Sequence, residues 1–325
     1  MTFIVPTDER ETPFTHYGVS VKKGSVEDAF RAAGLLDWNI RMAPMSAVDP
    51  NTDQVVHADD RYATLFDKPE GGVGYLGTNG LKYCPIPNED LISLASGILD
   101  DSDLVADSVG HYRDRRRVFV NFRLPESIEI DGSNGGVNAY LFLASSHDGS
   151  IPLTAKVLLM RMSCKNQLNS IFGDRTAPTV KMRHTSGARP RLQDIREALG
   201  LSFRAVGDFS DMAKRWLDTE VTSDSFAQIM EQVFPYDEDS SKAAVTRAIN
   251  LRDSVEEVYT TSPTLQGLQR TAWGVINALV EHDDWGRTSR SSDARALGML
   301  EGRDRVKRGY ASAVANVLGR HDLLV

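Results

Sequence analysis

Hydrophobic and polar residues alternate through the middle of the chain. The clearest example is Arg117–Leu124, where an apolar side chain occupies every second position from Val118 to Leu124. Successive side chains of a strand point to opposite faces of a sheet, so this period of two predicts a β-strand. Comparable segments predict strands over five ranges: Val105–Gly110, Arg117–Leu124, Ser127–Asp131, Ala139–Ser145 and Leu153–Met162. Short turns rich in Asp, Asn and Gly separate them, which predicts an antiparallel β-meander.

Beyond Ala188 the apolar residues recur with the 3.6-residue period of a helix. Six helices are predicted there: Leu192–Leu199, Phe203–Leu217, Asp224–Val233, Ser240–Thr260, Thr264–His282 and Asp293–Leu318. Three more precede them: Ser25–Leu35, Pro87–Leu99 and Cys164–Phe172. Strands followed by helices predict the α+β class, with an antiparallel β-meander packed with helices and then a helical C-terminal region.

The same pattern divides the chain into three parts. We expect an N-terminal tail at 1–16, an α+β core with a basic surface at 17–190 and the helical C-terminal region at 191–325. Within the core, Asp49-Pro50-Asn51-Thr52 has the composition of a turn between two extended segments. The polar N-terminus lacks the features of a signal peptide, and no apolar run approaches the roughly 18 residues of a membrane span. We therefore expect a cytoplasmic protein, in a bacterial host cell, with no membrane partner.

Charge is distributed unevenly along the 325 residues, whose formal net charge is −8. The window Lys156–Arg196 contains nine Lys or Arg residues and only two acids, Asp174 and Asp194. The window Asp218–Asp239 contains seven acids and no Lys or Arg. Such separation concerns the partners of a protein rather than its fold. The basic window could therefore bind a polyanion even though the net charge of the whole chain is negative.

A run of arginines enters the most regular predicted strand. Alternation places Arg115, Arg117 and Arg123 on one face together with Phe119, and Arg116 belongs to the same run. Cations neutralise phosphates and an aromatic ring stacks on any base, so this face suits a single nucleic-acid strand. A solvated edge strand protected by charge is the alternative.

A second basic cluster lies between the last predicted strand and the helical region. Its members are Arg161, Lys165, Lys181, Arg183, His184, Arg189 and Arg191. Gly187 and Pro190 predict a loop, from which long side chains can reach a ligand. Neighbouring Ser and Thr hydroxyls could donate to phosphate. A solvated charged loop is the alternative interpretation.

Other chemistry finds less support. Ser145-Ser146-His147-Asp148-Gly149 resembles a nucleophile with its base, but adjacent strand residues face opposite ways, so we expect a turn. The glycines between Gly71 and Gly80 lack the Lys-Ser/Thr of a phosphate loop, and the seven histidines lack zinc-ligand spacing. Acid pairs such as Asp100-Asp101 and Asp283-Asp284 could in principle hold Mg²⁺, but nothing in the sequence brings them together, and a solvated helix end explains each pair. The two cysteines, Cys84 and Cys164, are expected to be reduced. We expect no cofactor and no metal.

Several of these segments resemble one family. They are Arg117–Val120, Ser145–Ser150, Met160–Leu168, Arg183–Thr185 and Thr271–Ala278. Together they look like the phage/plasmid-like family called domain of unknown function 932, from about Tyr17 to Leu318. The combination of Arg-x-x-Cys-x-Asn-x-Leu with the His-Asp-Gly turn is its most specific part, and Gln167 departs from the Thr expected there.

The resemblance implies a role in the DNA metabolism of mobile elements. The meander followed by a helix also resembles the core of single-strand annealing proteins, which need neither metal nor nucleotide and assemble into rings or filaments. The expected function is therefore single-stranded DNA binding and annealing in phage or plasmid recombination by a homo-oligomer. A phage exonuclease or a host single-strand-binding protein would be a further partner. The alternatives are a metal-dependent DNA-processing enzyme and a non-enzymatic phage regulator that binds a host protein.

Overall fold

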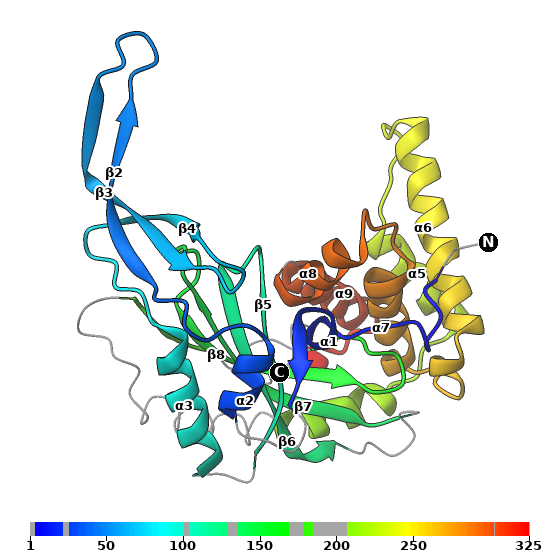
Figure 1. Cartoon of the computed structure of the whole chain (residues 1–325). Coiled ribbons are helices and arrows are strands. Elements are labelled where there is room, and N and C mark those ends of the chain that lie inside the picture. Colours follow the sequence, from blue (N-terminus) through cyan, green and yellow to red (C-terminus); the bar gives the residue numbers. More distant parts are fainter. Residues whose placement is uncertain are drawn as a thin grey trace.

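A six-stranded antiparallel sheet forms the centre of the protein (Figure 1). The computed structural model describes residues 4–21, 26–100, 104–128, 135–168, 179–184, 207–301 and 303–324. The strand order is β1-β5-β6-β7-β8-β9, so five consecutive strands form a meander with β1 at its edge. The bounds are β1 Gly18–Ser20, β5 Val105–Tyr112, β6 Arg117–Ile128, β7 Val137–Ser146, β8 Leu153–Arg161 and β9 Thr179–Met182. The predicted α+β class, with a helical C-terminal region, is confirmed.

The alternation along β6 produces two faces, and both are covered. Val118, Val120 and Phe122 belong to the main core, which also contains Phe30 and Trp273. The opposite face carries a second apolar cluster. Its buried members are Phe14, Tyr112, Phe119, Tyr140, Phe142, Ala144, Leu158 and Met160. Strands β6 and β7 are consequently apolar on both sides for part of their length, as in a sheet between two layers.

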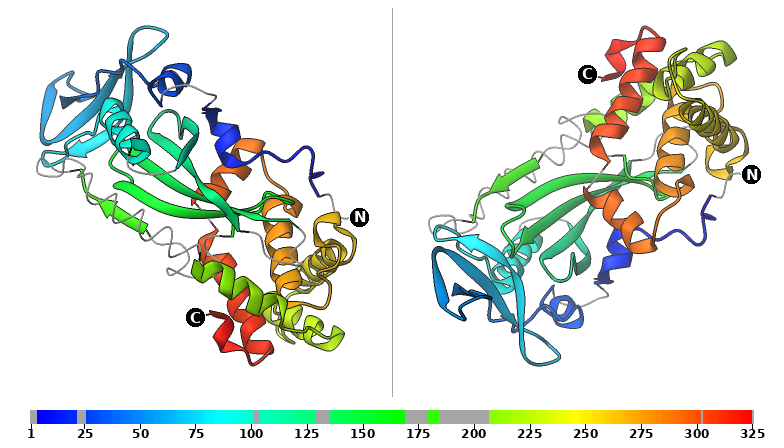
Figure 2. Two further views of the ribbon diagram at one scale, coloured as in Figure 1. Left: turned by 90° about the horizontal axis from the view of Figure 1, so that it is seen from below. Right: turned by 90° about the horizontal axis from the view of Figure 1, so that it is seen from above.

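Helices cover the sheet from several parts of the chain (Figure 2). The N-terminal half supplies α1 Pro13–Tyr17, α2 Val26–Ala32 and α3 Asn88–Asp100. A helix at 207–217 begins the helical region within the described residues. It is followed by α5 Ser223–Val233, α6 Lys242–Thr261, α7 Ala272–Glu281, α8 Ser292–Glu301 and α9 Asp304–Val317, with short helices η1 Pro263–Leu265, η2 His282–Gly286 and η3 His321–Leu324.

Polar caps explain where three of these helices begin. Thr222, Ser241 and Thr271 each accept a hydrogen bond from the backbone N–H three residues later. Such side chains satisfy amide groups that have no partner within the helix. Each cap therefore defines its boundary locally. No helix in the described part of the chain is both long and apolar enough to cross a membrane.

A β-hairpin projects from the body as an arm (Figure 1). Strands β2 Arg41–Val48, β3 Val55–Asp67 and β4 Val73–Gly80 form a second, three-stranded sheet. Strand β4 pairs only with the Arg61–Asp67 part of β3, so the outer hairpin has two strands. Asp49 N–H donates to Gln54 at 2.9 Å across its end, where the turn was predicted.

Some predicted elements differ from the structure. Cys164–Leu168 is not the start of a helix: it folds back on β8, with Leu168 N–H donating to Leu159 O at 2.8 Å. Ser127 continues β6 after a register shift rather than beginning a new strand. The predicted helix Asp293–Leu318 is two helices, α8 and α9, and that over Thr264–His282 begins only at Ala272. Leu192–Leu199 lies outside the described residues.

Candidate nucleic-acid interface

The arginine run lies in a turn with an unusual backbone. Arg113, Asp114 and Arg115 have φ of 52°, 52° and 67°, the left-handed region that residues with a Cβ rarely adopt. The turn joins β5 to β6 and is held by Arg116 O, which accepts from His147 N–H at 2.8 Å. Such conformations persist only where the surrounding structure enforces them. The arginines are therefore positioned by a rigid turn.

Carboxylates neutralise most of that run. Arg115 makes a bidentate pair with Glu70, with N–O distances of 2.8 and 3.1 Å. This contact lowers the pKa of Glu70. Arg113 and Arg117 both bind Glu301 of α8, and Arg117 also donates to Ser150 Oγ at 3.0 Å. The prediction that Arg115 and Arg117 are free cations on an open sheet face is wrong.

Phe119 is not available to stack on a base. Its side chain is fully buried, with ring centroids 5.5 Å from Phe142 and 6.2 Å from Phe14. The alternation assigned Phe119 to the correct face of β6, but α1 packs over that face with Phe14. The ring therefore stabilises the second core.

Arg161 and Lys165 are also structural. Arg161 is fully buried and donates to Thr264 O at 2.6 Å and to Asn277 Oδ1 at 3.5 Å. Lys165, in the left-handed region, donates through Nζ to Arg10 O. Both side chains join β8 to other segments instead of facing solvent, which corrects their assignment as phosphate contacts.

Four exposed cations surround the turn between β7 and β8. We call Lys82, Arg116, Lys181 and Arg183 the turn patch; each is exposed, and none forms an ion pair with the residues that the structure describes. Arg116 O accepts a hydrogen bond from His147 N–H in this turn. Lys181 is paired in the sheet with Thr154, which lies on β8 shortly after the turn. Cys84 N–H donates to His184 O at 3.1 Å, which joins the segment of Lys82 to that of Arg183. Lys82 was not predicted, because no other basic residue lies near it in the sequence.

The remaining predicted cations lie elsewhere or cannot be placed. Arg123 is exposed and faces Tyr140 in the sheet register. It is six residues from Arg117, or about 20 Å along the strand, so it does not join the turn patch. Arg189 and Arg191 lie outside the described residues.

Buried histidines organise this turn. The pKa of His147 falls to about 3 because burial disfavours the charged ring. Its Nε2 lies 3.0 Å from Asn88 Oδ1, while Asn88 Nδ2 donates to Leu35 O, so Nε2 carries the proton. Burial lowers the pKa of His184 as well, and its ring stacks on Tyr83 at 5.2 Å. His184 thus contributes a neutral ring rather than a cation.

The Ser-His-Asp sequence forms a turn, as predicted. Asp148 Oδ1 accepts from Ser150 N–H at 2.9 Å instead of orienting the ring of His147. Ser145 Oγ lies 3.5 Å from His184 Nε2, but both residues are buried and His184 Nδ1 has no hydrogen-bond partner. A nucleophile needs a base that is itself oriented by a third group. This turn therefore does not have the geometry of a catalytic triad.

A buried ionic junction connects the sheet to the helical region. Arg10 binds Glu281 at 2.9 Å, and Thr264 Oγ1 donates to the same carboxylate at 2.5 Å. Lys307 binds Asp284 at 2.8 Å, and all four charged groups are 5% exposed or less. The segment expected as a tail thus buries Arg10 in this junction.

The prediction of a solvated helix end at Asp283-Asp284 is wrong. Both residues are buried in η2, where Asp283 binds Arg303 and lies 3.4 Å from Arg287. Burial raises the pKa of Asp284. Their carboxylates are thus occupied by cations of the chain itself. Over the part of the chain that the structure covers, no three His, Cys, Asp or Glu side chains gather as a metal site would require.

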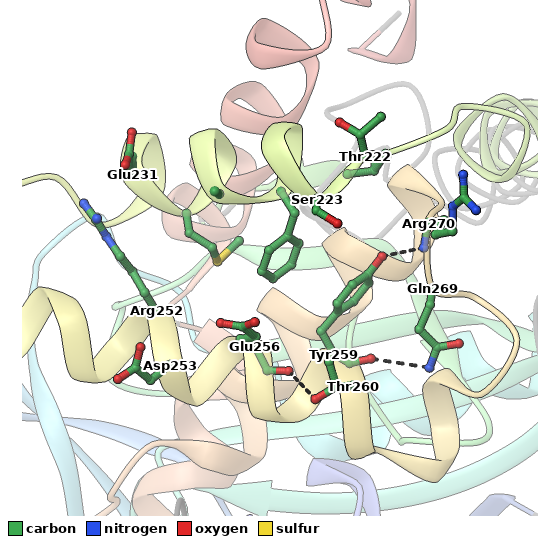
Figure 3. Close-up of a pocket in the computed structure, with 14 residues that line it drawn as sticks. Thr222, Ser223, Glu231, Arg252, Asp253, Glu256, Tyr259, Thr260, Gln269 and Arg270 are labelled. Carbon is green, nitrogen blue, oxygen red and sulfur yellow. Dashed lines mark hydrogen bonds between the residues drawn. The ribbon is translucent and has the colours of Figure 1, made fainter.

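A groove of about 740 Å³ lies between α5 and α6 (Figure 3). Its wall contains Phe226 stacked on Tyr259 at 4.7 Å. Arg252 donates to Phe234 O at 2.8 Å and Arg270 binds Glu220, so both cations of the groove are engaged. Three carboxylates also line it: Glu231, Asp253 and Glu256. Such a groove repels a phosphate backbone and does not extend the turn patch.

These features describe an α+β protein with a buried ionic junction and an exposed basic patch at one turn of its sheet. The model of the family "Domain of unknown function (DUF932)" matches residues 75–301. The chain belongs to this family. The match runs from within β4 to the end of α8 and includes the turn patch. Of the junction it includes Glu281 and Asp284, but not Arg10 or Lys307. No curated protein and no solved structure matches the chain.

Proposed function

We propose that this protein binds single-stranded DNA at the turn patch and promotes annealing as a homo-oligomer. It would act in phage or plasmid recombination, in the cytoplasm of the host cell, without a metal or a nucleotide. One observation carries the proposal: four exposed cations lie around the β7–β8 turn without a carboxylate partner among the described residues. Three other arginines of this region, Arg113, Arg115 and Arg117, already bind carboxylates of the chain.

The patch has the two components that single-strand binding requires. Lys and Arg side chains neutralise phosphates, and a ring beside them stacks on a base regardless of sequence. Tyr83 is half-buried and stacks on His184, while its hydroxyl donates to Ser146 O at 2.8 Å. The ring is thus held in place between Lys82 and the turn. The rigid backbone at Arg113–Arg115 leads into Arg116, whose carbonyl oxygen accepts from His147 N–H at the same turn.

The size of the patch sets the expected salt dependence. Each phosphate contact with a single strand contributes about 0.7 to the slope of log affinity against log salt, so four contacts give about 2.8. Contacts from segments outside the described residues would increase this slope. A protein of net charge −8 has no general attraction for a polyanion, so binding would depend on these local cations.

The test is a double charge reversal, Arg116→Glu with Arg183→Glu, assayed by fluorescence anisotropy on a labelled oligonucleotide without divalent metal. The matched control is Lys214→Glu with Arg290→Glu, since both residues are exposed and the change in net charge is identical. We expect the patch variant to lose at least about tenfold in affinity while the control retains it. Equal affinities would contradict the proposal.

The same preparation separates the alternatives. Product formation that depends on Mg²⁺ or Mn²⁺ would instead identify a DNA-processing enzyme. No affinity for any oligonucleotide at low salt, with a specific host protein retained, would identify a regulator.

A further inference from the structure

The outer part of the arm is exposed on every side. From Met45 to Asp60 no residue is buried, and Val48, Val55 and Val56 are 61%, 53% and 55% exposed. Beyond β4 the hairpin has only two strands, and an isolated two-stranded hairpin is marginally stable in water. Apolar side chains clustered on a projecting element indicate a contact surface.

All the charged side chains of the outer arm, from Met45 to Asp60, are acidic. Between Met45 and Asp60 there are four aspartates and no Lys or Arg: Asp49, Asp53, Asp59 and Asp60. Among the described residues, the one ion pair of these aspartates joins Asp60 to Arg61, whose Nε lies 3.8 Å away. A nucleic-acid strand would be repelled by this surface. Its partner must instead combine apolar surface with positive charge.

A groove of this character exists at the other end of the same chain. It has a volume of about 830 Å³ and lies between the N-terminal half of α6 and η2. Lys242, Arg247 and Arg287 line it, with Ala243 and Leu251 among the apolar contributions, and none of its lining residues is a carboxylate. Lys242 and Arg247 are exposed and form no ion pair with any residue that the structure places.

The two surfaces cannot meet within one molecule. Both the arm and α6 project from the body, at opposite ends of it (Figures 1 and 2). Of the α6 residues from Lys242 to Arg247, none is buried. An acidic, apolar arm and a basic groove on one chain form a complementary pair only between two copies.

We propose that the arm of one copy docks in the α6–η2 groove of a second copy. The aspartates of the arm lie against Lys242 and Arg247, and the valines cover the apolar floor. Because the two surfaces differ, each docked chain retains a free arm or a free groove, which leads to head-to-tail assembly. This inference deepens the proposed function, since it names the contact that would build the annealing oligomer.

The experiment is sedimentation velocity of the full chain, without DNA, over a range of concentrations. We expect wild-type protein to form species heavier than the 35.9 kDa chain. Val55→Thr with Val56→Thr keeps the β-branched residues that strands prefer and removes apolar contact. This variant is expected to weaken association at least about tenfold. A wild-type chain that remains monomeric at all concentrations would overturn the proposal.

Charge exchange tests the pairing itself. Asp59→Lys with Asp60→Lys on the arm, or Lys242→Glu with Arg247→Glu on the groove, should each weaken association about tenfold or more. In a mixture, the unaltered arm of the groove variant can dock in the unaltered groove of the arm variant, so mixed assemblies should form that neither variant forms alone. Circular dichroism checks that each variant is folded. No recovery on mixing folded variants would refute the docking.

The outcome is distinguishable from failure of the DNA proposal. A monomeric arm variant should still bind a short oligonucleotide, because the turn patch is unchanged. The Arg116→Glu, Arg183→Glu variant should still assemble. Arm variants that bind DNA less tightly but assemble normally would show that the arm contacts DNA rather than a second copy.

Discussion

Replacement of Lys307 by Met would remove the cation from a buried pair while keeping a side chain of similar length. Lys307 is 2% exposed, and its Nζ donates to Asp284 at 2.9 Å and to Gln167 O at 2.9 Å. Without Lys307 the Asp284 carboxylate loses the cation that it contacts directly and remains out of water. Breaking a buried ion pair in this way costs about 3–5 kcal/mol. A domain is typically stable by about 5–15 kcal/mol, so the effect is large.

Protonation of Asp284 limits the loss of stability in Lys307→Met and makes that loss depend on pH. Burial already raises the pKa of Asp284 above that of the unfolded chain. Loss of Lys307 raises it further, because the lysine is the main group that opposes this shift. The carboxyl group of Asp284 therefore loses its proton at a lower pH in the unfolded state than in the folded state. As a result, the stability that Lys307→Met loses relative to wild type is greatest at neutral pH, and it shrinks as the pH falls through the folded pKa of Asp284.

The assay is urea unfolding followed by tryptophan fluorescence at pH 7 and pH 5. Lys214→Met, on the exposed side of the helix at 207–217, is the matched control. The double variant Lys307→Met with Asp284→Asn should recover much of the loss, because it removes the uncompensated charge. A deficit for Lys307→Met below about 1 kcal/mol, or one equal to the control, would refute the role assigned to this pair.

Three further results are expected. Phe119→Ala should reduce the free energy of unfolding by about 3–5 kcal/mol in urea, because the ring is fully buried; a loss under about 1 kcal/mol would contradict its burial. The pKa of His147 is about 3 in the folded state, so on acidification the unfolded state binds a proton at this histidine first. The free energy of unfolding should therefore fall by about 2–3 kcal/mol from pH 6.5 to 4.5. The His147→Gln variant should show a flatter dependence on pH, and an unchanged dependence would exclude His147 as its source. Gly149→Ala should destabilise by about 1–3 kcal/mol, since φ is 72° and a Cβ would clash with Asn79 Oδ1; a neutral effect on thermal unfolding would show that the turn relaxes.

Local patterns were sufficient for the fold class and for the main strands of the central sheet. The alternation in β6, the helical period in α5 and the composition of the turn at Asp49 each act over a few residues. Such signals are written in the chain itself, because backbone hydrogen bonds and side-chain direction depend on near neighbours. The α+β order of strands and helices follows from them.

Partner choice among the charged residues was decided by the tertiary structure. Glu70 and Glu301 are far in sequence from the arginines that they bind, and Arg161 looks like any other basic residue until Thr264 O is placed beside it. A charged side chain can bind a ligand only if no other residue of the fold already neutralises it. Whether it is neutralised depends on which segments pack together, and contacts between distant segments produce no periodic pattern in the sequence. The turn patch and the arm consequently became visible only when the chain was folded.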